Sequence, residues 1–524
     1  MSDARAAMVS GSPRDRAASN GVPAPSGNGI PPGPNGTAAL DRIEALVDPR
    51  SFRPWRSAVG DGVIAGFARV GGRPLCVWTQ DGTLKGGSLG AAGGETIVRT
   101  IRMANRAGVP VAGFPHSGGA RLQEGVAALS AYGAIFREQS RARVLQLTVI
   151  AGPCAGGAAY SPALGEFVVM LGPNARLFLT GPEVVERVTR ESVDAEQLGG
   201  PRIQTTNGVA HFVAPEEQAA ADLLRDLIGY LPSVAGGAPP IVPAEAPPVG
   251  DPAASLPGNS REVYDVRDVI RALADRGRHL EVASRWARNM VTSFGRLAGV
   301  PVGFICNQPR YLGGTIDYSA SEKGAWFVNL CDRFRLPLVV LVDTPGFLPG
   351  RNQEQAGVIR HGASLLRAFA RATTPKLTVT LRQAYGGAHI VMNSRDLGAD
   401  LTLAWPGAWM GIMGAQQAVA ITERRAIAAG ADAGALAAAY EDAKLKVDGA
   451  AHDGFVDEVV EPADTRDRLV EALELFGARA PVRAVGGEAA FHDEPELASA
   501  YVADAGAGAL GPWSVDPVLG SRIG

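Results

Sequence analysis

The chain has 524 residues, of which 46% are hydrophobic and 20% charged, and its formal net charge is −3. This length provides for two domains with cores of their own, and the near-neutral charge offers no basic face for nucleic acid. No apolar run reaches the roughly 18 residues that span a bilayer, and the first residues lack the apolar stretch of a secretory signal. We therefore expect neither nucleic acid nor a membrane as a partner.

The four cysteines, Cys76, Cys154, Cys306 and Cys331, lie far apart in the sequence. None belongs to a Cys-x-x-Cys pair, so the sequence indicates neither a zinc ribbon nor a disulfide framework. The seven histidines show no metal-ligand spacing. We expect no metal site, and a reducing, cytoplasmic location.

The first segments in chain order are a tail, a short helix and a hairpin. Residues 1–36 are rich in Gly, Pro, Ser and Asn and cannot bury enough apolar surface to offset the entropy of ordering, so we expect disorder there. A short amphipathic helix begins at Asp41. Two strand-like runs, 62–70 and 74–79, flank a two-glycine turn and predict a β-hairpin.

Helix-like and strand-like segments then alternate through the rest of the first half. This alternation is typical of a mainly parallel sheet covered by helices, so we predict an α/β fold. The apolar spacing predicts helices over 95–107, 122–140, 157–164 and 219–231, and strands over 109–114, 145–151 and 167–171. The expected boundaries are an N-terminal domain at 37–235, a Pro- and Ala-rich linker at 236–261, a C-terminal domain at 262–479 and a flexible tail at 480–524.

The second half of the sequence repeats the first at an offset of about 227 to 230 residues. The stretch Phe67-Ala-Arg-Val-Gly-Gly-Arg-Pro74 corresponds to Phe294-Gly-Arg-Leu-Ala-Gly-Val-Pro301, and Gly133 corresponds to Gly362. A repeat of this length is a duplicated domain rather than a solenoid unit. We therefore expect two matched sites, one in each half.

Two glycine turns are the strongest candidates for chemistry. Gly156-Gly157 follows one predicted strand and opens a helix, and Gly386-Gly387-Ala388 repeats the pattern. The first N–H groups of a helix have no partner inside the helix, and the helix dipole favours negative charge there. Such a turn can form an oxyanion hole from backbone alone. Glycines that serve only tight turns would give the same pattern, and this alternative stays open for each turn.

Two more strand-to-helix turns, Ser117-Gly-Gly-Ala-Arg121 and Asp343-Thr-Pro-Gly346, lie at the edge where open α/β sheets bind ligands. Ser117 is outside any Gly-x-Ser-x-Gly elbow, so no serine nucleophile is predicted. We interpret His116 and His389, which border turns, as packed or solvated histidines rather than general bases. No Walker A loop is present in the sequence.

Several stretches resemble the carboxyltransferase (β) subunit of biotin-dependent acyl-CoA carboxylases, the acetyl-CoA and propionyl-CoA carboxylase group. The resemblance covers roughly residues 40–476, with its motifs in order and at family-like spacing. The motifs are Gly86-Gly-Ser-Leu-Gly90, Ser117-Gly-Gly-Ala-Arg-Leu-Gln-Glu-Gly-Val126, Gly152-Pro-Cys-Ala-Gly-Gly-Ala-Ala-Tyr-Ser-Pro-Ala163, Thr180-Gly-Pro-Glu-Val-Val185, Ser321-Glu-Lys323, Asp343-Thr-Pro-Gly-Phe-Leu-Pro-Gly350, Ala384-Tyr-Gly-Gly-Ala388, Ala404-Trp-Pro406 and Met413-Gly-Ala-Gln416.

The resemblance implies two tandem crotonase-like domains built from ββα units, usually assembled as a hexamer of two stacked trimeric rings. The active site of such proteins lies between the N-terminal domain of one subunit and the C-terminal domain of its neighbour. The implied reaction moves a carboxyl group from carboxybiotin, held on a separate carrier, to the α carbon of an acyl-CoA. Biotin itself acts as the base, so the protein supplies backbone amides instead of catalytic side chains.

The same resemblance implies roles for individual residues. Gly156 and Gly157 would hold the thioester oxygen, and Gly387 and Ala388 would hold the ureido oxygen of biotin. Further contacts to the acyl-CoA would come from Gly86, Gly87, Ser117, Gly118, Gly119, Ala120, Arg121 and Ile390, and further contacts to biotin from Gly346, Phe347 and Gly386.

The sequence departs from many propionyl-type members of the family. It has His389-Ile390 where Tyr-Asp is common, and the apolar Ile390 favours acetyl-CoA, with propionyl-CoA close behind because one methylene discriminates by only ~1–3 kcal/mol. Gln383 stands where Lys is common, which would weaken a contact with a phosphate or with the carrier. The usual basic C-terminal tail is absent, which would weaken docking of the partner. The sequence has no Met-Lys-Met biotinylation motif and no ATP-grasp region, so we expect a biotinylated α subunit, or a carrier with a biotin carboxylase, as partner.

Three alternatives stay open. The chain could be the carboxyltransferase subunit of a biotin-dependent acyl-CoA decarboxylase, because the motifs barely differ. A biotin-free crotonase-type hydratase or isomerase would need a carboxylate in the site, for which Glu124 and Glu354 are the candidates. The intact amide turns disfavour the third alternative, a scaffold without turnover.

Overall fold

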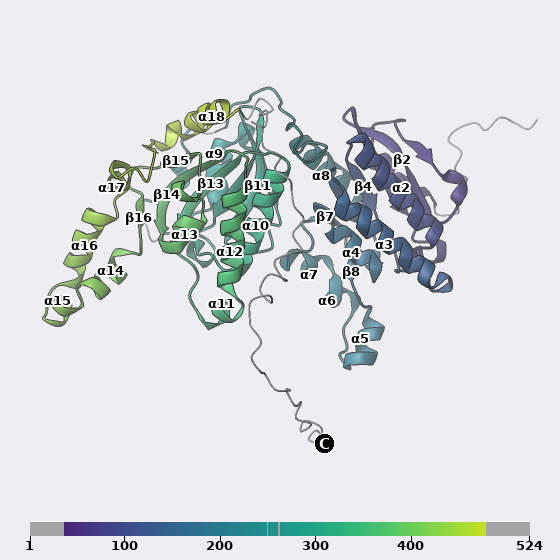
Figure 1. The fold of residues 1–524 in the computed structure, drawn as a ribbon, viewed down its shortest axis with the longest axis horizontal. Coiled ribbons are helices and arrows are strands. Elements are labelled where there is room, and N and C mark those ends of the chain that lie inside the picture. Colours follow the sequence, from purple (N-terminus) through teal and green to yellow (C-terminus); the bar gives the residue numbers. More distant parts are fainter. Residues whose placement is uncertain (1–35, 249, 260–261, 478–524) are drawn as a thin grey trace, which may run out of the picture. The chain divides into compact units, whose positions relative to one another are not determined.

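The computed structural model describes residues 36–248, 250–259 and 262–477, which form two β-sheets of the same design covered by helices (Figure 1). The predicted α/β fold is confirmed. The tails predicted at 1–36 and 480–524 lie outside the described residues, except that residue 36 opens the first helix.

The first sheet has seven strands in the order β1-β2-β3-β4-β5-β7-β9. The pairs β1–β2 and β2–β3 are antiparallel, so the predicted hairpin is present, and the later pairs are parallel. β6 and β8 form a separate parallel pair. The strands are β1 (Arg53–Trp55), β2 (Val63–Val70), β3 (Arg73–Gln80), β4 (Val111–Phe114), β5 (Gln146–Ile150), β6 (Pro153–Ala155), β7 (Phe167–Leu171), β8 (Arg176–Phe178) and β9 (Phe212–Ala214).

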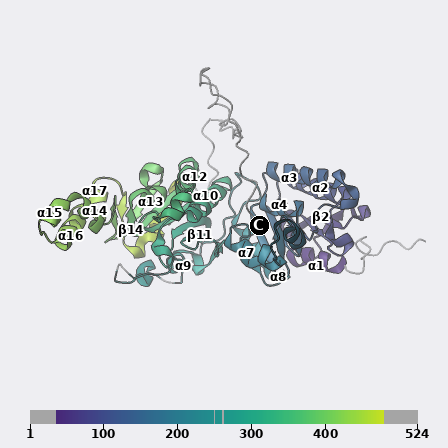
Figure 2. The same ribbon diagram turned by 90° about the horizontal axis from the view of Figure 1, so that it is seen from below.

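Helices cover both faces of this sheet. Figure 2 shows α2 and α3 side by side on one face and α1 and α8 on the other. The helices are α1 (Gly36–Leu46), α2 (Ala91–Ala107), α3 (Val126–Arg141), α4 (Gly157–Ala163), α5 (Pro182–Thr189), α6 (Ala195–Gly199), α7 (Pro201–Thr206) and α8 (Glu217–Tyr230).

The second sheet repeats the first in strand order and direction. Its path is β10-β11-β12-β13-β14-β15-β17, with β16 paired to the end of β14, as β8 is paired to β6 in the first half. The strands are β10 (His279–Val282), β11 (Met290–Leu297), β12 (Val300–Asn307), β13 (Leu338–Thr344), β14 (Lys376–Tyr385), β15 (Leu401–Ala404), β16 (Trp409–Gly411) and β17 (Glu458–Val459).

The second sheet also has helices on both faces. α10 and α12 pack on each other as α2 and α3 do, while α9 and α18 pack on the opposite face. The helices are α9 (Val266–Leu273), α10 (Tyr318–Arg333), α11 (Arg351–Gln355), α12 (Val358–Arg371), α13 (Gly386–Val391), α14 (Ala415–Thr422), α15 (Arg424–Ala428), α16 (Ala433–Lys444), α17 (Val447–His452) and α18 (Thr465–Leu475).

Three predicted helices differ from the structure at their first turns. α1 begins at Gly36 rather than at Asp41. α2 begins at Ala91 rather than at residue 95, so its first turn includes Gly93 and Gly94, which have a low helix propensity. Gly94 lies against α3, where a Cβ built on it would lie 2.5 Å from Cβ of Ala131. α3 begins at Val126 rather than at residue 122, because Gly125 has φ 54° and ψ −129°, which no helix accommodates.

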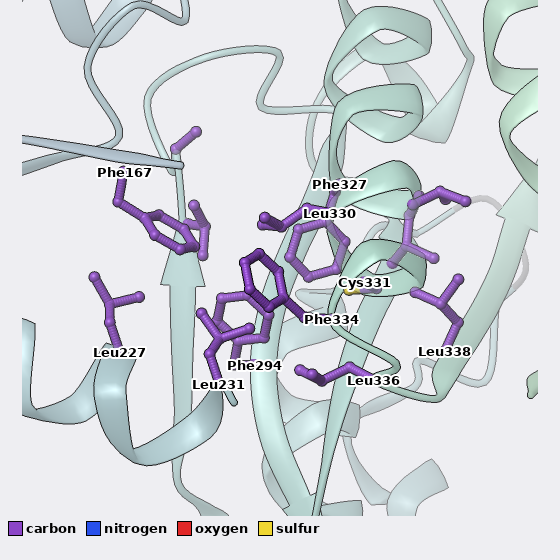
Figure 3. Packing of buried hydrophobic residues seen from close by; sticks show 14 of the residues in the cluster. Phe167, Leu227, Leu231, Phe294, Phe327, Leu330, Cys331, Phe334, Leu336 and Leu338 are labelled. Carbon is purple, nitrogen blue, oxygen red and sulfur yellow. The ribbon is translucent and has the colours of Figure 1, made fainter. Parts of the chain in front are cut away.

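One buried cluster joins the two halves. Phe167 and Leu227 of the first half pack with Phe294 and Phe327 of the second (Figure 3), and the ring centroids of Phe167 and Phe294 are 6.1 Å apart. An aromatic ring buries a large apolar area, so such contacts contribute strongly to stability. Each half has its own sheet and a buried cluster of its own, while this further cluster is shared between the halves.

The segment predicted as a linker, 236–261, is bound to the rest of the chain through backbone hydrogen bonds. The N–H of Gly236 donates to the Arg333 carbonyl at 2.8 Å, and the N–H of Val242 donates to the Gly299 carbonyl at 3.1 Å. Residues 249, 260 and 261 lie outside the described residues. The domain boundaries at 235 and 262 stay predictions, while these contacts attach the described part of the segment to the second half.

His211 stands at the junction of the halves and makes stability sensitive to acid. Its ring stacks on Trp326 with centroids 4.6 Å apart, and its Nδ1 accepts a 3.0 Å hydrogen bond from the N–H of Val168. Burial lowers the pKa of His211 from 6.5 to about 4.

We expect the free energy of unfolding to fall as the pH drops from 6.5 towards 4, by up to roughly 3 kcal/mol. In this window the unfolded chain binds a proton at His211 that the folded chain does not. Urea unfolding at a series of pH values measures this slope, with His211→Asn as the variant that keeps an acceptor but does not titrate. An equal acid slope in His211→Asn would contradict the assignment.

Candidate functional site

Three segments of the first half, which follow β3, β4 and β5, meet beyond the carboxyl ends of these strands. The N–H of Gly118 donates to the Gly86 carbonyl at 3.2 Å, and the N–H of Leu89 donates to the Gly119 carbonyl at 2.9 Å. The N–H of Ser117 donates to the Pro153 carbonyl at 2.7 Å. The N–H of Ala155, which precedes the Gly156 turn, donates to the Ser117 carbonyl at 3.1 Å. These contacts bring together the predicted residues Gly86, Gly87, Ser117, Gly118, Gly119, Ala120, Arg121, Gly156 and Gly157.

Gly87 shows why a glycine is required in this contact. Its φ is +67°, and a Cβ atom built on it would lie 2.1 Å from the carbonyl oxygen of His116. Any larger residue would separate the loop that follows β3 from the loop that follows β4. Gly314 of the second half has φ +78° and would place a Cβ 2.5 Å from the Asp343 carbonyl oxygen.

The loops of the second half repeat these hydrogen bonds. The N–H of Ile316 donates to the Gly346 carbonyl at 3.0 Å, and the N–H of Leu348 donates to the Ile316 carbonyl at 2.9 Å. They correspond to the bonds of Leu89 and Arg121 in the first half, which are both 2.9 Å long. The repeat seen in the sequence therefore extends to single backbone contacts around both turns.

The first oxyanion turn differs from the expectation at Gly156. This residue has φ 59°, and its N–H already donates to the carbonyl oxygens of Phe178 and Leu179, at 3.3 and 3.1 Å. The amide of Gly156 is therefore occupied within the protein. Gly157 is the first residue of α4, where amides have no acceptor inside the helix, so Gly157 is the better placed of the two donors.

The second turn presents Gly387 on the surface and Ala388 beneath it. Gly386 has φ 58° and turns the chain out of β14 into α13, and a Cβ on it would lie 2.9 Å from the Ile412 carbonyl oxygen. Phe347 reaches the turn from the loop after β13: a Cβ on Gly387 would lie 3.7 Å from its Cε2 atom. The structure thus brings the predicted residues Gly346, Phe347, Gly386, Gly387 and Ala388 into one place.

Ile390 lies one helical turn after Gly387 in α13. Residues three apart share a face of a helix, and the Ile390 side chain is 48% exposed. An exposed apolar side chain beside an exposed amide suits a ligand with a polar and an apolar end. This placement is compatible with the predicted role of Ile390 beside an acyl chain.

Arg121 holds its own turn together. It is 4% exposed, and its guanidinium forms ion pairs with Asp61 at 2.5 Å and Glu124 at 2.7 Å. It also donates to the Ser88 carbonyl at 2.8 Å. A side chain with these partners supports the loop; its predicted direct contact with a substrate does not follow from this geometry.

Glu124, one of two carboxylates considered for acid–base chemistry, is held as an acceptor. It accepts a hydrogen bond from the N–H of Ala91 at 2.7 Å, and this bond, followed by that of Arg121, lowers its pKa. A lowered pKa makes a poor general base. The other carboxylate, Glu354, lies in α11 with an exposed side chain.

The two histidines near the turns are packed, as interpreted from the sequence. Cβ atoms built on Gly82 and Gly152 would lie 2.5 and 2.6 Å from the His116 ring, so His116 is held between two glycines. Burial lowers the pKa of both His116 and His389. Both rings are therefore neutral at physiological pH, and the glycines were the sequence signal for the packing of His116.

A cavity of about 1030 Å³ lies in the second half among β14, β16, α14 and α16. Gln383, Met413 and Gln416 line it, together with Arg382, whose Nε donates to Asp343 at 2.8 Å. Four of the resemblance motifs contribute to this lining, through Pro345, Tyr385, Trp405 with Pro406, and Met413 with Gln416.

All four cysteines, Cys76, Cys154, Cys306 and Cys331, are free and buried. Among the described residues, no cluster of three or more His, Cys, Asp or Glu side chains could bind a metal ion, and no helix is both long and apolar enough to cross a bilayer.

Comparison with known proteins places these features in a family. The sequence profile of the carboxyl transferase domain matches residues 35–481. A propionyl-CoA carboxylase beta chain of Saccharopolyspora erythraea is 43% identical over 479 residues, which cover 84% of this chain and 87% of that protein. A methylmalonyl-CoA decarboxylase subunit alpha of Veillonella parvula is 43% identical over 431 residues, covering 81% and 84%.

A solved structure gives the same fold. The transcarboxylase 12S hexamer, crystallised with methylmalonyl-coenzyme A and methylmalonic acid bound, matches with a TM-score of 0.81 at 40% identity, covering 86% of this chain and 92% of that one. The shared fold is crotonase-like, so the predicted fold class is confirmed.

Proposed function

The chain belongs to the carboxyl transferase family and is a biotin-dependent acyl-CoA carboxyltransferase, and we propose that it carboxylates the α carbon of a short acyl-CoA. The single observation that carries the proposal is the duplicated amide turn. Gly157 is the first residue of α4 and Gly387 the second residue of α13, and both lie at the ligand edge of a sheet. Two such turns suit a reaction that develops negative charge on two oxygens.

The second-half turn is the proposed biotin holder. Biotin, when bound on its carrier, supplies both the carboxyl group and the base. The residues present fit it: Gly387 and Ala388 offer amides at a helix start, and the Phe347 ring borders them. Gly386 and Gly346 shape the two loops that carry these groups.

The first-half turn is the proposed thioester holder. Gly157 would donate its N–H to the thioester oxygen, which stabilises the charge that develops when the α proton leaves. Gly156 would supply the turn rather than the donor. Gly86, Gly87 and the loop Ser117–Ala120 would line the acyl-CoA beside it, while Arg121 would fix that loop from beneath.

For the acyl group we propose acetyl-CoA and propionyl-CoA, giving malonyl-CoA and methylmalonyl-CoA. The name of the Saccharopolyspora erythraea relative favours propionyl-CoA, and the apolar Ile390 leaves acetyl-CoA as an equal candidate. Ile390→Asp should change the ratio of kcat/KM between these two substrates by roughly 10-fold, because it places a charge beside the acyl chain. Steady-state rates with both substrates measure the ratio, and an unchanged ratio would remove Ile390 from the specificity argument.

The proposed partners follow from the same reasoning. The chain would work with a biotinylated α subunit, or with a biotin carboxyl carrier and a biotin carboxylase. It would assemble as a hexamer, as the transcarboxylase 12S protein does. A cytoplasmic location stays a prediction that rests on the four free cysteines.

A second candidate is the carboxyltransferase step of a biotin-dependent decarboxylase. The Veillonella parvula relative carries that name. The chemistry is the reverse half-reaction at the same amides, so the direction depends on the partner subunits rather than on this site.

Reconstitution tests both candidates. The purified chain is combined with biotinylated carrier, biotin carboxylase, ATP and labelled bicarbonate, and offered acetyl-, propionyl- and longer acyl-CoAs. We expect label in malonyl- or methylmalonyl-CoA. Transfer only from methylmalonyl-CoA to biotin would support the decarboxylase, and no transfer in either direction with any carrier would refute the proposal.

A further inference from the structure

Tyr132, in the first half of α3, touches both turns of the first half. Its side chain is buried, with the residue 4% exposed. The backbone of Gly157 rests on its ring: a Cβ atom built on Gly157 would lie only 2.9 Å from Cγ of Tyr132. At the other end of the ring, the Tyr132 hydroxyl lies 3.2 Å from Oγ of Ser117.

Ser117 also accepts hydrogen bonds from its own loop and from the strand before the Gly156 turn. Its Oγ accepts a 3.2 Å hydrogen bond from the N–H of Gly119, and its carbonyl accepts a 3.1 Å bond from the N–H of Ala155. Burial raises the pKa of Tyr132 to about 12, so the phenol keeps its proton at working pH. One side chain therefore bridges the Gly156-Gly157 turn and the 117–121 loop.

The corresponding position of the second half lacks this bridge. His361 precedes Gly362 as Tyr132 precedes Gly133, but Nδ1 of His361 lies 2.8 Å from Glu322 and its Nε2 lies 2.9 Å from Arg360. The ring next to the Gly387 turn comes from Phe347 instead. The tyrosine bridge is thus specific to the first half, where the thioester is proposed to bind.

We propose that Tyr132 is a positioning residue that sets the spacing between the Gly157 amide and the loop that lines the acyl-CoA. The inference rests on the proposed function of the first-half turn. The ring supports Gly157 from beneath, and the hydroxyl fixes Ser117. The two contacts should therefore affect different kinetic constants: the hydroxyl acts on acyl-CoA binding and the ring on the rate of transfer.

The first test removes only the hydroxyl. Tyr132→Phe should raise KM for the acyl-CoA about 5- to 10-fold with kcat within twofold of the wild-type value, because one hydrogen bond at the binding loop is lost. Ser117→Ala should raise KM at least as much, and the double variant Tyr132→Phe/Ser117→Ala should match Ser117→Ala alone, since both changes break the same bond.

The second test removes the ring. Tyr132→Leu should lower kcat at least 10-fold, and the conservative Tyr132→Phe should recover it. Tyr230→Phe is the matched control, because Tyr230 stacks on Phe294 instead, and it should leave both constants unchanged. A purely structural role would lower Tm in all Tyr132 variants while leaving kcat and KM per folded molecule at wild-type values.

The outcomes separate this inference from the proposed function. If the wild-type chain transfers carboxyl groups and Tyr132→Phe has an unchanged KM, or if the Tyr132→Phe and Ser117→Ala effects multiply, the positioning role is wrong. If the wild-type chain transfers no carboxyl group at all, the proposed function is wrong, and the positioning role that rests on it is wrong as well.

Discussion

Gly387→Pro is expected to reduce carboxyl transfer by about 10²- to 10³-fold while the protein stays folded. Proline removes the backbone N–H proposed to bind the biotin oxygen, and losing one such donor costs roughly 3–4 kcal/mol of transition-state stabilisation. The first turn of a helix tolerates proline, and the Cβ position at Gly387 has only ordinary contacts, at 3.7 Å and beyond. The transfer rate from carboxylated carrier to acyl-CoA measures the effect, with Tm as the check on folding.

Gly387→Ala is the matched control, because it adds a Cβ but keeps the N–H. We expect it to retain most of the wild-type rate. If the alanine variant were as slow as the proline variant, the reduced rate would be due to the added Cβ atom rather than to the missing N–H group. A proline variant with a near-normal rate would remove Gly387 from the oxyanion assignment.

Lys323→Met is expected to have the largest effect on stability, about 3–5 kcal/mol. Lys323 is fully buried in α10, and its Nζ donates to three carbonyl oxygens of one loop, those of Ala283 at 3.0 Å, Trp286 at 2.9 Å and Met290 at 2.7 Å. Methionine fills a similar volume but leaves three buried acceptors without this donor. Urea unfolding followed by circular dichroism measures the loss.

Lys376→Met serves as the comparison. Lys376 is also buried, but its Nζ donates only to the Ala372 carbonyl among the described residues, at 2.7 Å. We expect its loss to cost about 1–2 kcal/mol. Equal losses in both variants would show that burial of the ammonium, rather than its three acceptors, determines the effect of Lys323.

The loop that Lys323 holds connects the two halves. The N–H of Ala283 donates to the His211 carbonyl at 3.2 Å, and a Cβ atom built on Gly208 would lie 2.7 Å from the Trp286 ring. We therefore expect Lys323→Met to lower the free energy of unfolding without changing the conformation of either amide turn. At low temperature, where the variant is folded, its rate of carboxyl transfer should equal that of the wild type.

The features predicted best from the sequence are those that a single residue type requires. Gly87 and Gly386 have positive φ and leave no room for a side chain. Because only glycine fits such a position, the glycine in the sequence indicates the turn in the structure. The strand-to-helix turns and the duplication could be inferred from such glycines. Gly71 and Gly72 in the hairpin turn between β2 and β3 also have positive φ, at +55° and +77°, although a Cβ there would meet no atom within 4 Å.

What the sequence did not reveal depends on partners that are distant in the chain. Arg121 was expected to contact substrate, but Asp61 and Ser88 bind it, and no local pattern announces an acceptor 60 residues away. The engagement of the Gly156 amide by Phe178 and Leu179 depends on where β8 lies. The bridging contacts of Tyr132 likewise required the packing of α3 against two loops.

The shared core has a consequence for how this duplicated chain can be divided. Phe167 and Leu227 are buried by Phe294 and Phe327 of the other half (Figure 3). A fragment ending near residue 235 would keep a complete sheet but expose this apolar surface to water, and exposed surface of that kind promotes aggregation. We therefore expect the two copies to unfold in one transition, so that neither half serves as an independent domain.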